Sequence, residues 1–187
     1  MTGIEIFLLI FGILIVIIII IIVILAALGY FGTKKINQIL QGNFSFAPLT
    51  SRSQHVTSVS HPSKANDTLV LSTSTTIPCS DYSWKLTNNF LQLNNFNATV
   101  IPGSTGATGP SDKDAIQLQG PTGANDFNQW VFKDDLLRWC LKSNESLCIR
   151  NNSGTLELGQ TSFSSITQTG FEWIPENELV SPACSSQ

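Results

Sequence analysis

The sequence predicts an all-β domain built from three repeats and preceded by one transmembrane α-helix. Three observations carry this prediction. Residues 6–28 contain no charged or polar side chain. The rest of the chain is rich in Ser, Thr, Asn and Gly, a composition typical of turn-rich β proteins. Three tryptophans, Trp84, Trp130 and Trp173, are spaced 46 and 43 residues apart and introduce similar segments.

Residues 6–28 are the predicted membrane helix. At about 1.5 Å per residue they are long enough to cross the roughly 30 Å hydrocarbon core of a bilayer, where a helix satisfies its own backbone hydrogen bonds. A cleaved signal peptide, with residues 27–29 as its cleavage site, is the alternative. The apolar run exceeds the usual roughly 7–15 residues, and Glu5 precedes it without any Lys or Arg. We therefore expect a retained anchor over residues 1–32, with the lipid bilayer as a partner.

The orientation of this anchor stays open. Lys34 and Lys35 follow the apolar segment, and the positive-inside rule then favours a cytoplasmic side for the remainder of the chain. Five glycosylation sequons favour the opposite side. They begin at Asn43, Asn66, Asn97, Asn144 and Asn151. The sequence predicts a single-pass membrane protein of undetermined topology.

Charge and cysteine content exclude several classes of function. The chain has 10 Lys and Arg against 13 Asp and Glu, without a basic cluster, which argues against nucleic-acid binding. Its four cysteines lie outside the membrane segment, and an even number favours disulfides, with four free buried thiols as the alternative. They are Cys79, Cys140, Cys148 and Cys184. No two of these cysteines have C-x-x-C spacing, and no His lies near them in the sequence. We therefore expect no zinc site and no cofactor.

Residues 33–65 are predicted to be a juxtamembrane helical turn followed by a stalk. The apolar side chains of the turn have helical spacing. They are Ile36, Ile39 and Leu40. From residue 43 onward Ser and Thr dominate and no periodicity is sustained, as expected of a stalk. The two histidines, His55 and His61, stand singly there, and we expect them to be solvated rather than to bind a metal.

Residues 66–187 form the predicted domain, because the chain repeats itself there. Each tryptophan follows a short alternating strand and opens a strand, a polar turn and a returning strand. The three polar turns contain Asn88-Asn89, Asp134-Asp135 and Asn177-Glu178. Three copies are too few for a propeller, whereas a closed threefold β-trefoil suits them. A β-sandwich with coincidental repeats is the alternative. We expect the tryptophans to anchor the core of each repeat.

One copy also resembles a known family. Residues 115–118 read Ala-Ile-Gln-Leu, residues 128–130 read Asn-Gln-Trp, and Cys140-Leu141 follows. This order resembles one repeat of a ricin B-type β-trefoil lectin domain, with its Ile-Gln-Leu strand, Gln-x-Trp motif, hairpin and Cys-Leu strand. The resemblance covers residues 66–187 and is good only in the middle copy. The Gln-x-Trp motif is intact in none of the three.

The resemblance implies a disulfide pattern. In that family a disulfide joins the Cys-Leu position to the segment after the Ile-Gln-Leu strand. By this analogy Cys184 pairs with Cys79, which leaves Cys140 to pair with Cys148 across a short hairpin.

The resemblance also implies candidate sugar-binding residues. Sites in that family use an Asp after the Cys-Leu strand, an aromatic ring, and the Asn or Gln before the repeat tryptophan. Asn128 and Gln129 offer the last role, but Gln119 stands in the aromatic position and Lys142 in place of the Asp. The alternative interpretation is that Asn128 and Gln129 tie down the hairpin.

The sequence contains no catalytic motif. Both histidines lie in the predicted stalk, and Asp134-Asp135 is explained by its turn, so we expect no enzymatic activity. The anchor, the isoleucine run and the collagen-like glycine triplets near residues 103–109 resemble virion membrane proteins of large DNA viruses. That resemblance implies a non-catalytic attachment or scaffolding module in a virion membrane or at a cell surface, which binds a capsid protein or a receptor. A membrane-anchored carbohydrate-binding lectin is the alternative, and a lectin secreted after signal cleavage is a third.

Overall fold

The computed structural model describes residues 15–20, 35–73, 77–103, 108–161 and 170–177. The chain divides into two compact units, Met1–Asn37 and Gln38–Gln187.

The first unit contains a helical segment at residues 15–20, whose Ile and Val side chains are 42–55% exposed. Residues 35–40 are helical as well. In the part of the chain that the structure describes, no helix is both long and apolar enough to span a membrane. Most of the predicted membrane segment, residues 6–14 and 21–28, lies outside the described residues.

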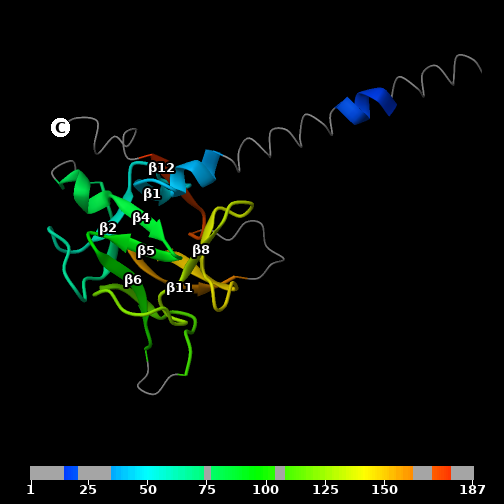
Figure 1. Ribbon diagram of the computed structural model, residues 1–187. Coiled ribbons are helices and arrows are strands. Elements are labelled where there is room, and N and C mark those ends of the chain that lie inside the picture. The colour runs from blue at the N-terminus through cyan, green and yellow to red at the C-terminus, as the bar shows by residue number, and fades with distance from the viewer. Residues whose placement is uncertain (1–14, 21–34, 74–76, 104–107, 162–169, 178–187) are drawn as a thin grey trace, which may run out of the picture. The chain divides into compact units, whose positions relative to one another are not determined.

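The second unit is built almost entirely from antiparallel strands that curl into one sheet (Figure 1). Its described residues form twelve strands and a short 3-10 helix, η1, which spans Cys79–Tyr82. The strands are β1 (Phe44–Pro48), β2 (His55–Ser58), β3 (Leu69–Ser72), β4 (Trp84–Thr87), β5 (Phe90–Leu93), β6 (Phe96–Ile101), β7 (Ala115–Gln119), β8 (Trp130–Lys133), β9 (Arg138–Leu141), β10 (Leu147–Asn152), β11 (Thr155–Gln160) and β12 (Trp173–Asn177).

The pairing of these strands repeats three times along the chain. The twelve strands fall into three consecutive groups of four, β1–β4, β5–β8 and β9–β12. Within each group the second and third strands pair with each other, as β2 with β3, β6 with β7, and β10 with β11. The fourth strand of each group pairs with the first strand of the next, as β4 with β5 and β8 with β9. β12 pairs with β1 and so closes the ring. This threefold plan is that of a β-trefoil, as the repeats predict.

Each fourth strand begins with a fully buried tryptophan. Trp84 Nε1 donates to Val56 O at 2.9 Å, on the second strand of its own group. Trp130 donates in the same way to Ala98 O at 2.8 Å, and Trp173 to Ile149 O at 3.0 Å. Because a buried indole N–H needs an acceptor, the three bonds tie the fourth strand of each group to its second strand.

Aromatic rings from the first and third groups meet in the core. The ring of Phe46 lies 5.3 Å from Trp84, 5.8 Å from Trp139 and 5.7 Å from Trp173, measured between centroids. Phe44 stacks on Trp139 at 5.7 Å. All five side chains are fully buried, so the first strand supplies the centre of the core.

The prediction of a stalk at residues 43–65 is therefore wrong. It contains β1 and β2, whose residues are all buried, and the first repeat begins at β1 rather than at residue 66. The two strands are only five and four residues long, too short for their alternation to stand out against the surrounding Ser and Thr. His55 is not solvated, because it opens β2 and is 3% exposed.

The cysteine pairing agrees with the family analogy where it is described. Cys140 and Cys148 form a disulfide between facing positions of β9 and β10. Cys79 is also disulfide-bonded, and its expected partner, Cys184, lies outside the described residues. The alternative of four free thiols is therefore wrong.

Candidate functional site

Asn128, the first of the two predicted sugar-binding residues, is completely buried. Its amide nitrogen donates to Thr122 Oγ1 and to Gly123 O, both at 3.0 Å. Its Oδ1 accepts the backbone N–H of Asn125 at 3.0 Å. Both N–H groups of Asn128 are thus committed to the loop before β8, a geometry that favours the framework role over contact with a ligand.

Gln129, the second predicted sugar-binding residue, contacts the hairpin that β4 and β5 form. Its Nε2 donates to Asn88 O at 3.4 Å, in the turn between β4 and β5. Asn88 and Asn89 both have positive φ, 53° and 68°, which asparagine tolerates better than most residues. Gln129 therefore links two repeats and ties down the hairpin.

The aromatic position of the lectin pattern carries no ring in any copy. Gln119 ends β7, and its Nε2 donates to Asn66 Oδ1 at 3.0 Å. The strand registers make Ser72 and Gly159 its equivalents in the other copies. At Gly159 the protein's own Phe171 fills the space, since a Cβ there would lie 2.5 Å from Phe171 Cζ.

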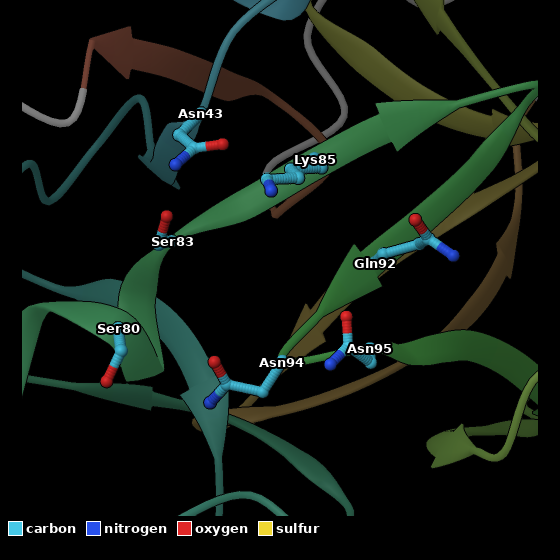
Figure 2. Close-up of a pocket in the computed structure, with 7 residues that line it drawn as sticks. All are labelled: Asn43, Ser80, Ser83, Lys85, Gln92, Asn94 and Asn95. Atoms are coloured by element: carbon cyan, nitrogen blue, oxygen red, sulfur yellow. The ribbon is translucent and has the colours of Figure 1, made fainter.

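A polar cleft of about 350 Å³ opens beside β4 and β5 in the first half of the domain (Figure 2). Every described residue that lines it carries an amide, a hydroxyl or an ammonium group. They are Asn43, Ser80, Ser83, Lys85, Gln92, Asn94 and Asn95. We call this the polar cleft.

Strand alternation builds the floor of the polar cleft. Trp84 and Leu93 face the core, so the intervening Lys85 and Gln92 face outward and oppose each other across β4 and β5. Trp84 also pairs with Phe44 of β1, which brings Asn43 beside Lys85. The residue before β1 and the two strands β4 and β5 thus present three polar side chains in one row.

A buried carboxylate fixes one wall of the polar cleft. Asn94 Nδ2 donates to Asp81 Oδ1 at 2.6 Å and to Ser63 Oγ at 3.4 Å. Asp81 is 2% exposed, and its Oδ2 lies 3.1 Å from His61 Nδ1. Asn94 and Asn95 form the turn between β5 and β6 with φ of 49° and 70°. The backbone and the Asp81 contact together hold the Asn94 amide in one orientation.

The polar character of this cleft distinguishes it from its two threefold equivalents. Val131 and Ile174 occupy the position of Lys85, one residue after the tryptophan in β8 and β12. Gln92 Nε2 donates to Asn97 Oδ1 at 2.9 Å, whereas the Cys140–Cys148 disulfide occupies the equivalent pair of positions in the next copy. The trefoil plan therefore does not require polar residues at this place.

The arrangement suits binding rather than covalent chemistry. Amide and hydroxyl groups can both donate to and accept from a ligand rich in hydroxyl groups. Within the described ranges, no cluster of three or more His, Cys, Asp or Glu side chains is placed to hold a metal ion.

The sequence analysis missed the polar cleft, although a signal was present. The residue after the tryptophan is Lys85 in the first copy and Val131 and Ile174 in the others. An alignment of the three copies on their tryptophans would have marked Lys85 as the exception.

No protein-family model and no curated protein matches this sequence. Solved structures do match it. The mdaA-1 domain has a TM-score of 0.62 at 15% identity, covering 75% of this chain and 92% of that domain. The agglutinin from Abrus precatorius has a TM-score of 0.55 at 10% identity, covering 72% of this chain and 48% of the agglutinin. The C-terminal half of the earthworm R-type lectin, in complex with GalNAc, has a TM-score of 0.50 at 10% identity, covering 72% of this chain and 98% of that half.

The domain has the fold of R-type lectins. At these identities the likeness shows the fold alone, and it confirms the β-trefoil expected from the resemblance to ricin B-type domains. The β-sandwich alternative is therefore wrong. The chain spans nearly all of the mdaA-1 domain but about half of the agglutinin.

Proposed function

We propose that this protein is a carbohydrate-binding module and that the polar cleft is its binding site. The observation that carries the proposal is the facing pair of Lys85 and Gln92, because Val131 with Cys140 and Ile174 with Ala47 stand at the two equivalent places. Sugar hydroxyls bind to amide and hydroxyl groups of this kind. The earthworm lectin of the same fold is in complex with GalNAc, which supports the chemical class of the ligand.

Two of the amides are oriented before any ligand arrives. Gln92 is held by Asn97 and Asn94 by Asp81, so binding costs little additional side-chain entropy. Among the described lining residues none is aromatic, so the stacking contribution of a ring is absent. We therefore expect weak binding to a single sugar and useful affinity only to glycans displayed many times on a surface.

The proposal extends to the N-terminal segment, which we infer to hold the module at a membrane. Six consecutive exposed Ile and Val side chains at residues 15–20 suit lipid better than water. A membrane-bound module that binds glycans would serve attachment to a glycan-bearing surface. The scaffolding role between a membrane and a capsid stays a prediction of the sequence.

A glycan array tests the proposal. The full chain is produced in a host without N-glycosylation, because Asn43 begins a sequon and lines the polar cleft. It is applied in detergent micelles to glycans printed at high density. We expect Gln92→Leu, which removes the side-chain amide, to lower the signal at least tenfold, and Gln160→Leu at the exposed end of β11 to leave it unchanged.

Two outcomes would contradict this assignment. A silent array would exclude carbohydrate binding under these conditions. Binding that survives Gln92→Leu and is lost in Asn128→Ala would move the site to the second repeat, where the family analogy places it.

A further inference from the structure

We propose that the polar cleft selects acidic saccharides, with the Lys85 ammonium binding a carboxylate of the glycan. This inference rests on the proposed function and adds the class of sugar to it.

Lys85 brings an unbalanced positive charge to the polar cleft. It is exposed, and the other described lining residues are uncharged. Within the described part of the chain, Lys85 forms no ion pair. Amides and hydroxyls can hydrogen-bond to an ammonium group, but they do not neutralise it.

The buried carboxylate of Asp81, behind Asn94, is engaged by its own contacts. Asp81 Oδ1 accepts the Asn94 amide at 2.6 Å, and Oδ2 faces His61 at 3.1 Å. With 2% of its surface exposed, Asp81 acts behind the wall of the cleft and not within it. A ligand that supplies a negative charge to Lys85 therefore gains a charge-assisted hydrogen bond that a neutral sugar lacks.

Other lysines of the same sheet are already engaged with protein groups. Lys133 pairs with Glu145, and Lys142 Nζ donates to Asn89 Oδ1 at 3.2 Å. Lys85 stands instead between Asn43 and Gln92, both of which can bind the hydroxyls next to an acid group. Val131 and Ile174 at the equivalent positions show that the fold itself does not call for a cation there.

The test uses an array of matched neutral and acidic glycans, such as galactose beside galacturonic acid and lactose beside sialyllactose. For the full chain in detergent micelles we expect about fivefold stronger binding to the acidic member, the size expected for one partly exposed ion pair. The preference should shrink in 0.5 M salt because screening weakens an exposed pair. Lys85→Met should abolish the preference, so that the neutral and acidic members bind equally, whereas Lys85→Arg should keep the preference.

Lys64→Met is the matched control, since Lys64 is an exposed lysine outside the polar cleft. Tryptophan fluorescence verifies that each variant is folded, and Lys85→Gln replaces Lys85→Met if the latter is not. Equal binding to neutral and acidic members, or a preference that survives Lys85→Met, would overturn this inference and leave the proposed function intact. A silent array would instead overturn the proposed function.

Discussion

At the scale of single residues, the third repeat depends on the contact between Gly159 and Phe171. A Cβ at position 159 would lie 2.5 and 2.7 Å from two atoms of the Phe171 ring and 3.1 Å from Arg150 Cβ. The ring is 4% exposed, and the guanidinium carbons of Arg138 and Arg150 lie 5.6 and 5.9 Å from its centroid. The glycine is needed because the ring leaves no room for a side chain.

Gly159→Ala should therefore destabilise the domain by about 1–3 kcal/mol, the usual cost of overpacking a buried site. Urea unfolding followed by tryptophan fluorescence measures this change. Gly120→Ala is the matched control, because a Cβ at Gly120 would meet no atom within 4 Å. Adding Phe171→Leu to Gly159→Ala should recover part of the loss. Equal stability of the two alanine variants would contradict the close contact.

The buried imidazole of His55 makes stability depend on pH. Burial lowers the pKa of His55 below its usual 6.5, and the carboxylate of Glu176 partly opposes that shift. The folded protein therefore binds fewer protons than the unfolded chain as the pH falls below 6.5. The stability contribution of neutral His55 is complete above pH 6.5 and is lost as the pH falls through the lowered pKa.

We expect a lower free energy of unfolding at pH 5.5 than at pH 7.5, and a smaller difference in His55→Gln. Urea midpoints at a series of pH values measure both. His61→Gln, which keeps the buried histidine, should retain the pH dependence that His55 causes. An unchanged pH dependence in His55→Gln would show that other groups are responsible.

At the scale of elements, equivalent positions on neighbouring strands are linked in two different ways in successive copies. Gln92 and Asn97 are joined by a hydrogen bond of 2.9 Å, and Cys140 and Cys148 by a disulfide. Both pairs connect the first strand of a group to the second. The disulfide closes a loop with a sequence separation of 8, so it restricts the unfolded chain.

Replacing both cysteines, as Cys140→Ala with Cys148→Ala, should cost about 2–3 kcal/mol from loop entropy. Thermal unfolding of the double variant beside the parent chain measures this cost. The side chain of Val131 packs against the disulfide. The single variant Val131→Ala is therefore a control that measures the loss of apolar contact alone. A double variant as stable as the parent would show that strand pairing suffices to hold β9 and β10 together.

Some elements were predictable and others were not, for physical reasons. Asn88-Asn89 predicts the turn between β4 and β5 because asparagine accepts the positive φ that a two-residue hairpin needs. β1 and β2 were not predicted because both strands are short. Their pairing partners, β12 and β3, also do not follow them directly in the sequence. His55 shows the consequence, since a residue expected in water is buried.

At the scale of the whole molecule, the tryptophan period identifies the fold because each indole performs the same task in each copy. The buried N–H needs a carbonyl acceptor, and this requirement keeps the residue and its spacing recognisable. The polar cleft is not recognisable in this way. Its position depends on the register of β1, β4 and β5, and its polar character depends on residues at which one copy differs from the other two. Registers of this kind come from tertiary pairing, which a single sequence does not display.

The N-terminal segment supplies the last prediction. A bilayer accepts a long run of isoleucine, whereas an arginine at the centre of a membrane helix costs about 2.5–3.5 kcal/mol for insertion. Ile17→Arg with Ile20→Arg should therefore release the chain from membranes in alkaline carbonate, while the parent chain stays bound. Ile17→Leu with Ile20→Leu is the matched control and should stay bound. Release of the parent chain in alkaline carbonate would contradict the anchor.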